Sequence, residues 1–459
     1  MTVEQNTQTA ELARGLKNRH VQMIALGGAI GSGLFLGSAQ AIHRAGPSLL
    51  LAYALGGMAV FMMARALGEL LLYRPVAGSF ATYAEEFVSP FAGFVTGWSY
   101  WFLWITVGIA EITAVSIYMK FWFPDLPQWV SALGTLFLLT TVNLLNVKVF
   151  GEFEFWFALI KVTAVIALLL FGGGVLIFGL GGDMGATASF SNLWSHGGLF
   201  ANGIGLMLLT LPIALFAFGG IEIIGVTAGE TEKPDYTLPR AINGAVIRIL
   251  VFYIGAIAVI MSLVPWTEIS PDASPFVMVF NHFGIPAASS IINLVVLTAA
   301  ASACNSGTYS CGRMLQSLAK SGQAPKFFNF VSSQHVPTRG IVASAATMLA
   351  GVVVNYFVPQ QAFIYVISVV VVIELWTWGI IIVSHLGYRR AVAAGKAVAS
   401  PYRMPWAPWS GYATLAFFAL ILVLLGFDDD TRIALYVTPV YFACLVLGWA
   451  AVRSKSAKS

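Results

Sequence analysis

Four ionisable side chains lie inside apolar stretches of this sequence, where a charge is costly. Glu111, Lys161, Glu222 and Glu374 are each flanked on both sides by mostly apolar residues. A charged residue at the centre of a membrane helix costs about 2.5–3.5 kcal/mol, whereas each Leu or Ile contributes about 0.3–0.6 kcal/mol in favour of insertion. We therefore expect these groups to be retained for internal pairing, such as a salt bridge from Lys161 to a glutamate, or for handling ions and polar ligands.

Two clusters of glycine interrupt apolar stretches. Residues 27–33 read Gly-Gly-Ala-Ile-Gly-Ser-Gly, and residues 216–222 read Phe-Ala-Phe-Gly-Gly-Ile-Glu. Each glycine costs a helix about 1 kcal/mol relative to alanine, and an unwound segment exposes backbone N–H and C=O groups that hydrocarbon cannot satisfy. N–H groups at the start of a half-helix suit a carboxylate, and free carbonyls suit an ammonium. The clusters therefore predict a site for a zwitterion, with close helix packing as the alternative for each cluster.

The elements that must position these groups are membrane spans. The chain has 459 residues, of which 58% are hydrophobic and 10% charged, against about 25% charged residues in a soluble domain. Runs such as 363–383 are long enough to cross about 30 Å of hydrocarbon at about 1.5 Å per residue. We predict an all-α membrane protein with twelve spans, at residues 22–42, 47–72, 91–123, 129–147, 155–180, 201–229, 243–265, 285–318, 340–357, 362–386, 408–427 and 433–452.

The distribution of basic residues predicts the orientation of the chain. With the N-terminus inside, twenty of the 24 Lys and Arg residues fall in cytoplasmic segments or at cytoplasmic span ends. This asymmetry predicts that both termini are cytoplasmic. The net charge of +4 then orients the protein and requires no nucleic acid or other polyanionic partner. Because the first twenty residues are polar, we expect no cleavable signal peptide and insertion through the first span.

The sequence lacks the motifs of metal sites, disulfides and membrane enzymes. Cys304 and Cys311 are seven residues apart on one predicted helix, about 10 Å along its axis and beyond the reach of a disulfide. No two histidines are spaced as helical metal ligands. His-Glu-x-x-His, the phosphate-binding loop, Gly-x-Ser-x-Gly and the dinucleotide fingerprint are all missing. We expect neither an enzyme nor a cofactor or metal site.

A set of short motifs resembles the amino-acid permeases of the amino acid–polyamine–organocation superfamily. The resemblance runs from about Arg14 to Arg453 and is closest to the bacterial amino acid transporter branch, which handles aromatic residues, proline, threonine, histidine, γ-aminobutyrate and D-alanine. The motifs are Gly27-Gly-Ala-Ile-Gly-Ser-Gly-Leu-Phe35, Arg65-Ala-Leu-Gly-Glu-Leu70, Pro75-Val-Ala-Gly-Ser-Phe80, Gly97-Trp-Ser-Tyr-Trp101, Glu152-Phe-Glu-Phe-Trp-Phe157, Gly219-Gly-Ile-Glu222 and Leu238-Pro-Arg-Ala-Ile242.

The resemblance implies the fold of the bacterial leucine transporter, in which spans 1–5 and 6–10 are inverted repeats and two spans are added. The implied divisions are a cytoplasmic segment at 1–20, a transport core at 21–390 with repeats at about 21–180 and 201–386, two accessory helices at 391–453, and a cytoplasmic tail at 454–459.

The implied activity is proton-coupled import of an L-amino acid by alternating access across the cytoplasmic membrane of a bacterium. A polar or aromatic neutral amino acid such as histidine, threonine or proline is the expected substrate. The expected partners are this amino acid, protons and membrane lipid, and the sequence gives no signal for an oligomeric state. An exchanger of the same fold and a channel are the alternatives.

Carried over to this chain, the resemblance implies a backbone site for the α-amino acid. The substrate carboxylate would meet N–H groups and the hydroxyl around Ser32 and Gly33, and the ammonium would meet carbonyls near Ala29, Phe216 and Gly219. Phe216 occupies the position of the aromatic residue that closes over the substrate in relatives. The full predicted substrate-binding set is Ala29, Gly31, Ser32, Gly33, Glu111, Phe216, Gly219, Ser302 and Glu374.

Two residues are candidates for the coupled proton. Lys161 matches the lysine that, in similar proton-coupled permeases, fills the place of the sodium ion of related carriers. Its ammonium would replace Na⁺, and burial favours the neutral amine, so that a proton can be released. This predicts proton coupling without a sodium requirement. Glu222, next to the second glycine cluster, is the other candidate, and the sequence does not rank the two.

Two further glutamates are predicted to face the substrate. Glu111 would face either the substrate side chain or the polar stretch 298–306, which contains Ser302 and has helix-to-helix hydrogen bonding as its alternative role. Glu374 departs from the family pattern, which has an uncharged residue there. We expect Glu374 to line the cavity and to bind a polar or cationic part of the substrate, for example a histidine side chain.

Overall fold

A computed structural model describes residues 30–76, 79–145, 147–180, 187–228, 231, 233–332 and 336–456. Every regular element in these ranges is a helix, so the predicted all-α class is confirmed for the described part of the chain. In chain order the elements are η1 (Gly33–Gly37), α2 (Ser38–Ala45), η2 (Gly46–Ser48), α3 (Leu49–Tyr73), α4 (Ser79–Phe87), α5 (Pro90–Met119), α6 (Gln128–Leu145), α7 (Val147–Phe178), α8 (Asn192–Ser195), α9 (Gly203–Phe216), α10 (Ile223–Thr227), α11 (Pro234–Leu263), η5 (Trp266–Glu268), α12 (Pro275–His282), α13 (Pro286–Lys320), η6 (Lys326–Asn329), α14 (Thr338–Phe357), α15 (Ala362–Ala393), α16 (Trp409–Leu425) and α17 (Ile433–Ser456).

Eight helical stretches of the described part are long and apolar enough to cross a membrane. One of them, Gly33–Tyr73, joins η1, α2, η2 and α3, and three shorter apolar helices lie in α6, α9 and α16. The chain is therefore a multi-pass membrane protein. The count of twelve spans stays a prediction, because part of the first predicted span precedes residue 30 and lies outside the described residues.

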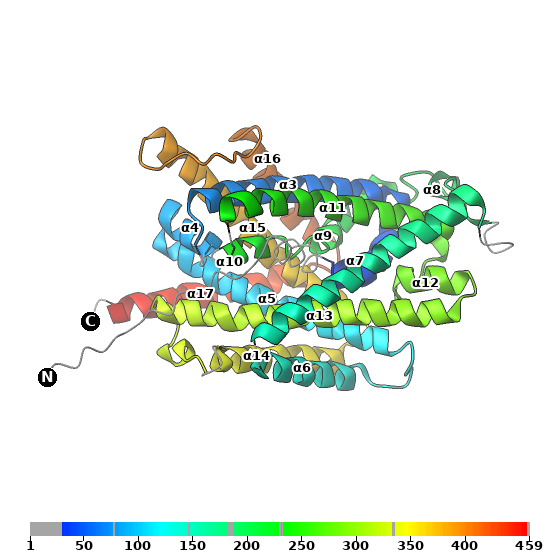
Figure 1. The fold of residues 1–459 in the computed structure, drawn as a ribbon, viewed down its shortest axis with the longest axis horizontal. Helices are drawn as coiled ribbons and strands as arrows, with labels where there is room; N and C mark the ends of the chain where they lie inside the picture. The colour runs from blue at the N-terminus through cyan, green and yellow to red at the C-terminus, as the bar shows by residue number, and fades with distance from the viewer. Residues whose placement is uncertain are drawn as a thin grey trace.

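The long helices form a bundle with α5 and α13 at its centre (Figure 1). α5 packs against α13 and α15, α3 packs against α11, and α6 packs against α14. In Figure 1, α3 and α11 lie along one side of the bundle and α6 and α14 along the opposite side, while α7 crosses obliquely. The short helices α8 and α12 lie at one end, and α4 lies at the other end. Residues 33–37 of η1, and most of the segment 217–222 between α9 and α10, are buried inside this bundle.

Proline and a serine cap determine where several long helices begin. α5, α11 and α13 start at Pro90, Pro234 and Pro286, and proline is favourable there because the first N–H groups of a helix have no intrahelical acceptor. The Ser89 side chain also accepts a hydrogen bond from the Ala92 N–H at 3.1 Å. That bond satisfies one of the free donors at the start of α5.

A buried carboxylate connects three segments of the bundle. Glu69 of α3 lies 2.8 Å from His385 Nε2 and accepts a hydrogen bond from Arg389 Nη1 at 3.1 Å, both on α15. It also accepts a bond from the Met404 backbone N–H at 2.7 Å, in the segment before α16. The side chains of Glu69 and His385 are 4% and 0% exposed. The cluster therefore fixes α15 and the following segment against α3.

We predict that Glu69→Ala lowers the free energy of unfolding by about 3–5 kcal/mol, because it leaves buried donors without their acceptor. Unfolding of the purified protein in detergent measures the change. The control is Glu86→Ala, since Glu86 pairs with Arg74 where both side chains are partly exposed, and such pairs contribute about 0–1 kcal/mol. Equal losses in the two variants would contradict the prediction.

Candidate functional site

The second glycine cluster breaks a helix. α9 ends at Phe216 and α10 begins at Ile223, and the segment 217–222 between them is a turn. Gly220 has φ +91°, a conformation that only glycine adopts without strain. The break that the sequence predicts at Gly219 and Gly220 is therefore confirmed.

The first cluster adjoins the start of another helix. η1 and α2 form a continuous helix from Gly33 to Ala45. Ala29, predicted to supply a carbonyl, lies outside the described residues. A Cβ atom on Gly33 would lie 2.6 Å from Ala217 Cα, so the start of this helix packs backbone against backbone on the second break. The fold thus brings the two glycine segments together.

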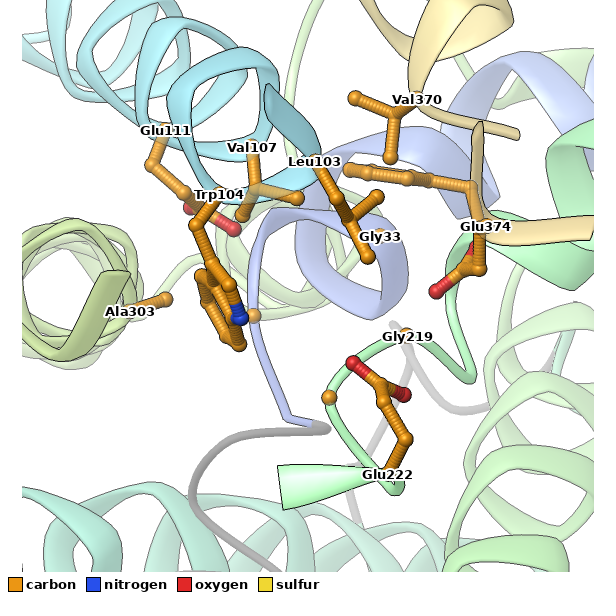
Figure 2. Close-up of a pocket in the computed structure, with 13 residues that line it drawn as sticks. Gly33, Leu103, Trp104, Val107, Glu111, Gly219, Glu222, Ala303, Val370 and Glu374 are labelled. Carbon is orange, nitrogen blue, oxygen red and sulfur yellow. The ribbon is translucent and has the colours of Figure 1, made fainter. Parts of the chain in front are cut away.

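A small cavity, with about 20 Å³ of room for the centre of a water molecule, lies where the two segments meet. Apolar side chains such as Leu103, Val107 and Val370 form part of its wall (Figure 2). Six residues of the predicted substrate-binding set line it together with Glu222; the six are Gly31, Gly33, Glu111, Phe216, Gly219 and Glu374. The predicted residues that are described and do not line it are Ser32, whose backbone adjoins it, and Ser302.

Two carboxyl groups approach the second break. A Cβ atom on Gly219 would collide with Glu374 Oε1 and would lie 3.3 Å from Glu374 Cδ. Glu222 accepts a hydrogen bond from Trp378 Nε1 at 3.2 Å, and both glutamates are buried. Figure 2 shows both carboxyl groups directed toward the segment with Gly219. Glu374 Oε2 has no hydrogen-bond partner among the described residues, so it is an open acceptor for a donor group of a ligand.

A third carboxyl group covers the start of the first helix. Glu111 Oε1 accepts a hydrogen bond from the Ser32 N–H at 3.3 Å. The same oxygen would lie 2.8 Å from a Cβ atom on Gly31, so a side chain there would force the carboxyl group to shift. Glu111 is 3% exposed, and its Oε2 has no hydrogen-bond partner in the described part of the chain. Glu111 is thus bound to the backbone of the first segment rather than to the polar stretch 298–306.

Lys161 does not line the cavity but interacts with Glu111, which does. It is fully buried on α7, and its side chain interacts electrostatically with Glu154 and Glu111. Ser302 of α13 donates to Glu154 Oε1 and Oε2 at 3.2 and 3.1 Å. The structure therefore brings Lys161 and Glu111 together but does not bring Ser302 to the cavity.

The polar stretch 298–306 makes bonds between helices. Besides the bond from Ser302 to Glu154, Asn143 Nδ2 of α6 donates to Asn305 Oδ1 at 2.7 Å. These bonds match the role that the sequence offered as the alternative for this stretch. In the described part of the chain, no three His, Cys, Asp or Glu side chains gather as metal ligands would.

Two residues of this region were missed by reasoning from the sequence. Glu154 interacts with Lys161, and Trp104 lines the cavity. Helical spacing could have found both, because residues seven apart lie on the same face of a helix. Glu154 precedes Lys161 by seven residues, and Trp104 precedes Glu111 by seven.

Comparison with known proteins agrees with this geometry. The family model described as amino acid permease matches residues 20–458. The "Uncharacterized amino acid permease YtnA" and the "Probable threonine/serine transporter YbxG" of Bacillus subtilis are each 48% identical over 439 residues, which cover 96% of this chain and 95% of the relative. The "D-serine/D-alanine/glycine transporter" of Escherichia coli is 45% identical over 450 residues, covering 97% of this chain and 95% of that protein.

The match extends over nearly the whole chain, so it includes both glycine segments and all the helices around them. It confirms the resemblance that the motifs indicate, and it identifies a family of transporters rather than enzymes. The chain belongs to the amino acid permease family, within the amino acid–polyamine–organocation superfamily.

Proposed function

We propose that this protein imports an amino acid together with a proton across the cytoplasmic membrane by alternating access. The observation that carries the proposal is the cavity between the two glycine segments. Its wall combines backbone from both segments with Glu111, Glu222 and Glu374. Backbone N–H groups and carbonyls suit the carboxylate and ammonium that all α-amino acids share.

The proposal includes the architecture of twelve spans with two inverted repeats and two accessory helices, and cytoplasmic termini. Support comes from the place of the glycine segments, near 27–33 and 216–222, which would begin the two repeats. In inverted-repeat carriers the discontinuous helices lie at the interface of the repeats, where the substrate binds. The transport core would then comprise residues 21–390.

Proton coupling is assigned to Lys161 or Glu222. Lys161 is fully buried and has two carboxyl groups, those of Glu154 and Glu111, within electrostatic reach. Such an ammonium provides a positive charge where a sodium-coupled carrier needs Na⁺. It can also lose and regain its proton during the cycle. Glu222 lies at the second break and is also fully buried.

The proposed substrate is a polar or aromatic neutral amino acid such as threonine, histidine or proline. The names of two relatives refer to threonine and serine, and to D-serine, D-alanine and glycine. These names favour a small polar substrate, threonine among those expected. The acceptor atoms of Glu374 also favour a substrate with a hydrogen-bond donor.

Uptake into proteoliposomes tests the proposed function. Radiolabelled threonine is offered with all common amino acids as competitors, with and without sodium, and with an imposed pH gradient and nothing loaded inside. We expect accumulation driven by the pH gradient and unaffected by sodium. Uptake that requires amino acid inside the vesicle would instead identify an exchanger. Flux without stimulation by unlabelled substrate on the far side would identify a channel.

We predict that Glu374→Gln changes which amino acids compete for uptake. Competition by histidine and other donor-bearing amino acids should weaken about two- to tenfold, because the substitution replaces one carboxyl oxygen with an amide group that cannot accept, and a net hydrogen bond contributes about 0.5–1.5 kcal/mol. Competition by apolar amino acids should change less. The measurement is the inhibition constant of each amino acid, with Glu85→Gln, at an exposed position of α4, as the control. Identical competition profiles in Glu374→Gln and the parent would contradict the role of Glu374.

A further inference from the structure

The contact between Glu111 and the first glycine segment resembles the contact expected of a bound substrate. The Ser32 N–H, which the family resemblance assigns to the substrate carboxylate, donates instead to Glu111 Oε1 at 3.3 Å. Glu111 belongs to α5 and is 79 residues distant in the chain. A carboxyl group of the protein itself therefore occupies the position at which an amino-acid carboxylate is expected.

The Glu111 carboxyl group lies at the cavity. Glu111 and Gly31 both line it, and the absence of a side chain on Gly31 lets Glu111 Oε1 approach the backbone. Glu111 Oε2 is buried without a hydrogen-bond partner among the described residues. Buried carboxyl oxygens are normally hydrogen-bonded, and this group is held at the first glycine segment by the 3.3 Å bond to Oε1, which is the bond that a competing carboxylate would replace.

We propose that the Glu111 carboxyl group holds the place of the substrate carboxylate in the empty protein and is displaced when an amino acid binds. This inference rests on the proposed function, because it assumes an amino-acid ligand at the first glycine segment. In this structure the Glu111 side chain already interacts electrostatically with Lys161. Glu111 thereby connects occupation of the site to the buried lysine.

Displacement of the Glu111 carboxyl group by the substrate carboxylate makes substrate binding depend on pH. Two carboxylates close together do not readily ionise at the same time, so an amino acid displaces a protonated Glu111 more easily than an ionised one. Binding is therefore tighter at low pH, because it is linked to protonation of Glu111. Among the described residues, the other titratable groups that interact with Glu111 are Lys161 of α7, Tyr253 of α11, Cys304 of α13 and Tyr118 of α5.

Among these neighbours, the lysine is the one that brings charge. Tyrosine and cysteine side chains are ordinarily neutral below about pH 8. Variants at Glu111 keep Lys161 but remove one of its carboxyl partners. Lys161 also interacts with Glu154. A variant at Glu154 therefore separates the loss of a lysine partner from the loss of the contact with Ser32.

The test is equilibrium binding of radiolabelled threonine to the purified parent, Glu111→Gln and Glu154→Gln proteins between about pH 5 and pH 8. The parent and Glu111→Gln should bind alike at the acid end. At the alkaline end Glu111→Gln should bind about tenfold more tightly, because no carboxylate competes for the Ser32 N–H. Glu154→Gln should still bind more tightly at the acid end than at the alkaline end, since Ser32 still meets Glu111, although the midpoint shifts with the charge near Lys161.

A second ligand and a second variant sharpen the test. Threoninamide has no carboxylate, so Glu111→Gln should not improve its binding relative to the parent. Glu111→Asp keeps a charge near Lys161 but is one methylene shorter, so it should also bind threonine more tightly at the alkaline end. This variant serves if Glu111→Gln does not fold, and gel filtration and thermal unfolding verify the fold of each protein.

Two results would overturn the inference alone: equal pH profiles of threonine binding in the parent and both Glu111 variants, or the same gain in affinity for threoninamide as for threonine. Failure of the parent to bind or transport any amino acid would overturn the proposed function and this inference with it. The parent measurements therefore distinguish the two failures.

Discussion

Gly33→Ala is expected to reduce amino-acid uptake by at least about a hundredfold, because a misplacement of about 1 Å at a substrate site has effects of this size. The new methyl group would lie 2.6 Å from Ala217 Cα and 3.1 Å from Ala217 N. These are backbone atoms of the broken segment between α9 and α10, so they cannot rotate away as a side chain can. Relief requires the two glycine segments to move apart, which distorts the cavity between them. Uptake of threonine into proteoliposomes measures the loss.

Gly37→Ala is the matched control for this substitution. Gly37 lies one turn further along the same helix, and a Cβ atom there would be 3.8 Å from its nearest neighbour, the Ser32 carbonyl oxygen. That distance is an ordinary van der Waals contact, and alanine favours a helix over glycine by about 1 kcal/mol. The control should therefore fold and transport like the parent. Normal uptake by Gly33→Ala would show that close packing of the two segments is not required for transport.

Lys161→Met is expected to abolish the accumulation of amino acid driven by a pH gradient. The substitution preserves much of the volume of the side chain but removes the ammonium that interacts with Glu154 and Glu111. Without it, the site lacks a positive charge in place of Na⁺ and a group that can release a proton. Removing one member of a buried ionic cluster also costs about 3–5 kcal/mol of stability. Uptake with and without an imposed pH gradient measures the effect on coupling.

The double variant Lys161→Met with Glu154→Gln separates coupling from stability. Neutralising Glu154 removes a buried carboxylate that the first substitution leaves uncompensated, so the double variant should recover much of the lost stability. Accumulation driven by the pH gradient should stay absent, while exchange between labelled and unlabelled substrate continues. Accumulation in a folded Lys161→Met protein at the level of the parent would exclude Lys161 from the coupling step.

Local features of the sequence predict the break between α9 and α10. Gly219 and Gly220 interrupt an apolar stretch, and the conformation of Gly220 is one that only glycine adopts easily. Such a break can be predicted from a short stretch of sequence, because it depends on the backbone conformation of a few consecutive residues. The membrane spans are equally local, since about twenty apolar residues in succession suffice to cross the hydrocarbon.

The partners of the buried charges could not be predicted in the same way. Ser302 was expected at the substrate and instead hydrogen-bonds to Glu154. Glu111 had two possible positions in the sequence analysis, and its hydrogen bond is to a third group, the Ser32 N–H. Both contacts join helices that are far apart in the chain, so they depend on how the helices rotate and approach one another. Helical periodicity gives the face on which a side chain lies but not the helix that the face meets.

The sequence by itself indicated an all-helical membrane protein and an amino acid permease, and it marked two glycine segments and four buried ionisable residues as candidates for function. The length of an apolar stretch, the preferences of glycine and the family motifs each depend on short runs of consecutive residues. The tertiary structure decided that Gly33 packs on Ala217 and that the cavity between the segments holds three carboxyl groups. It also decided that Glu111 covers the Ser32 N–H. These contacts arise only when the long helices pack, because close packing fixes positions that no single helix specifies.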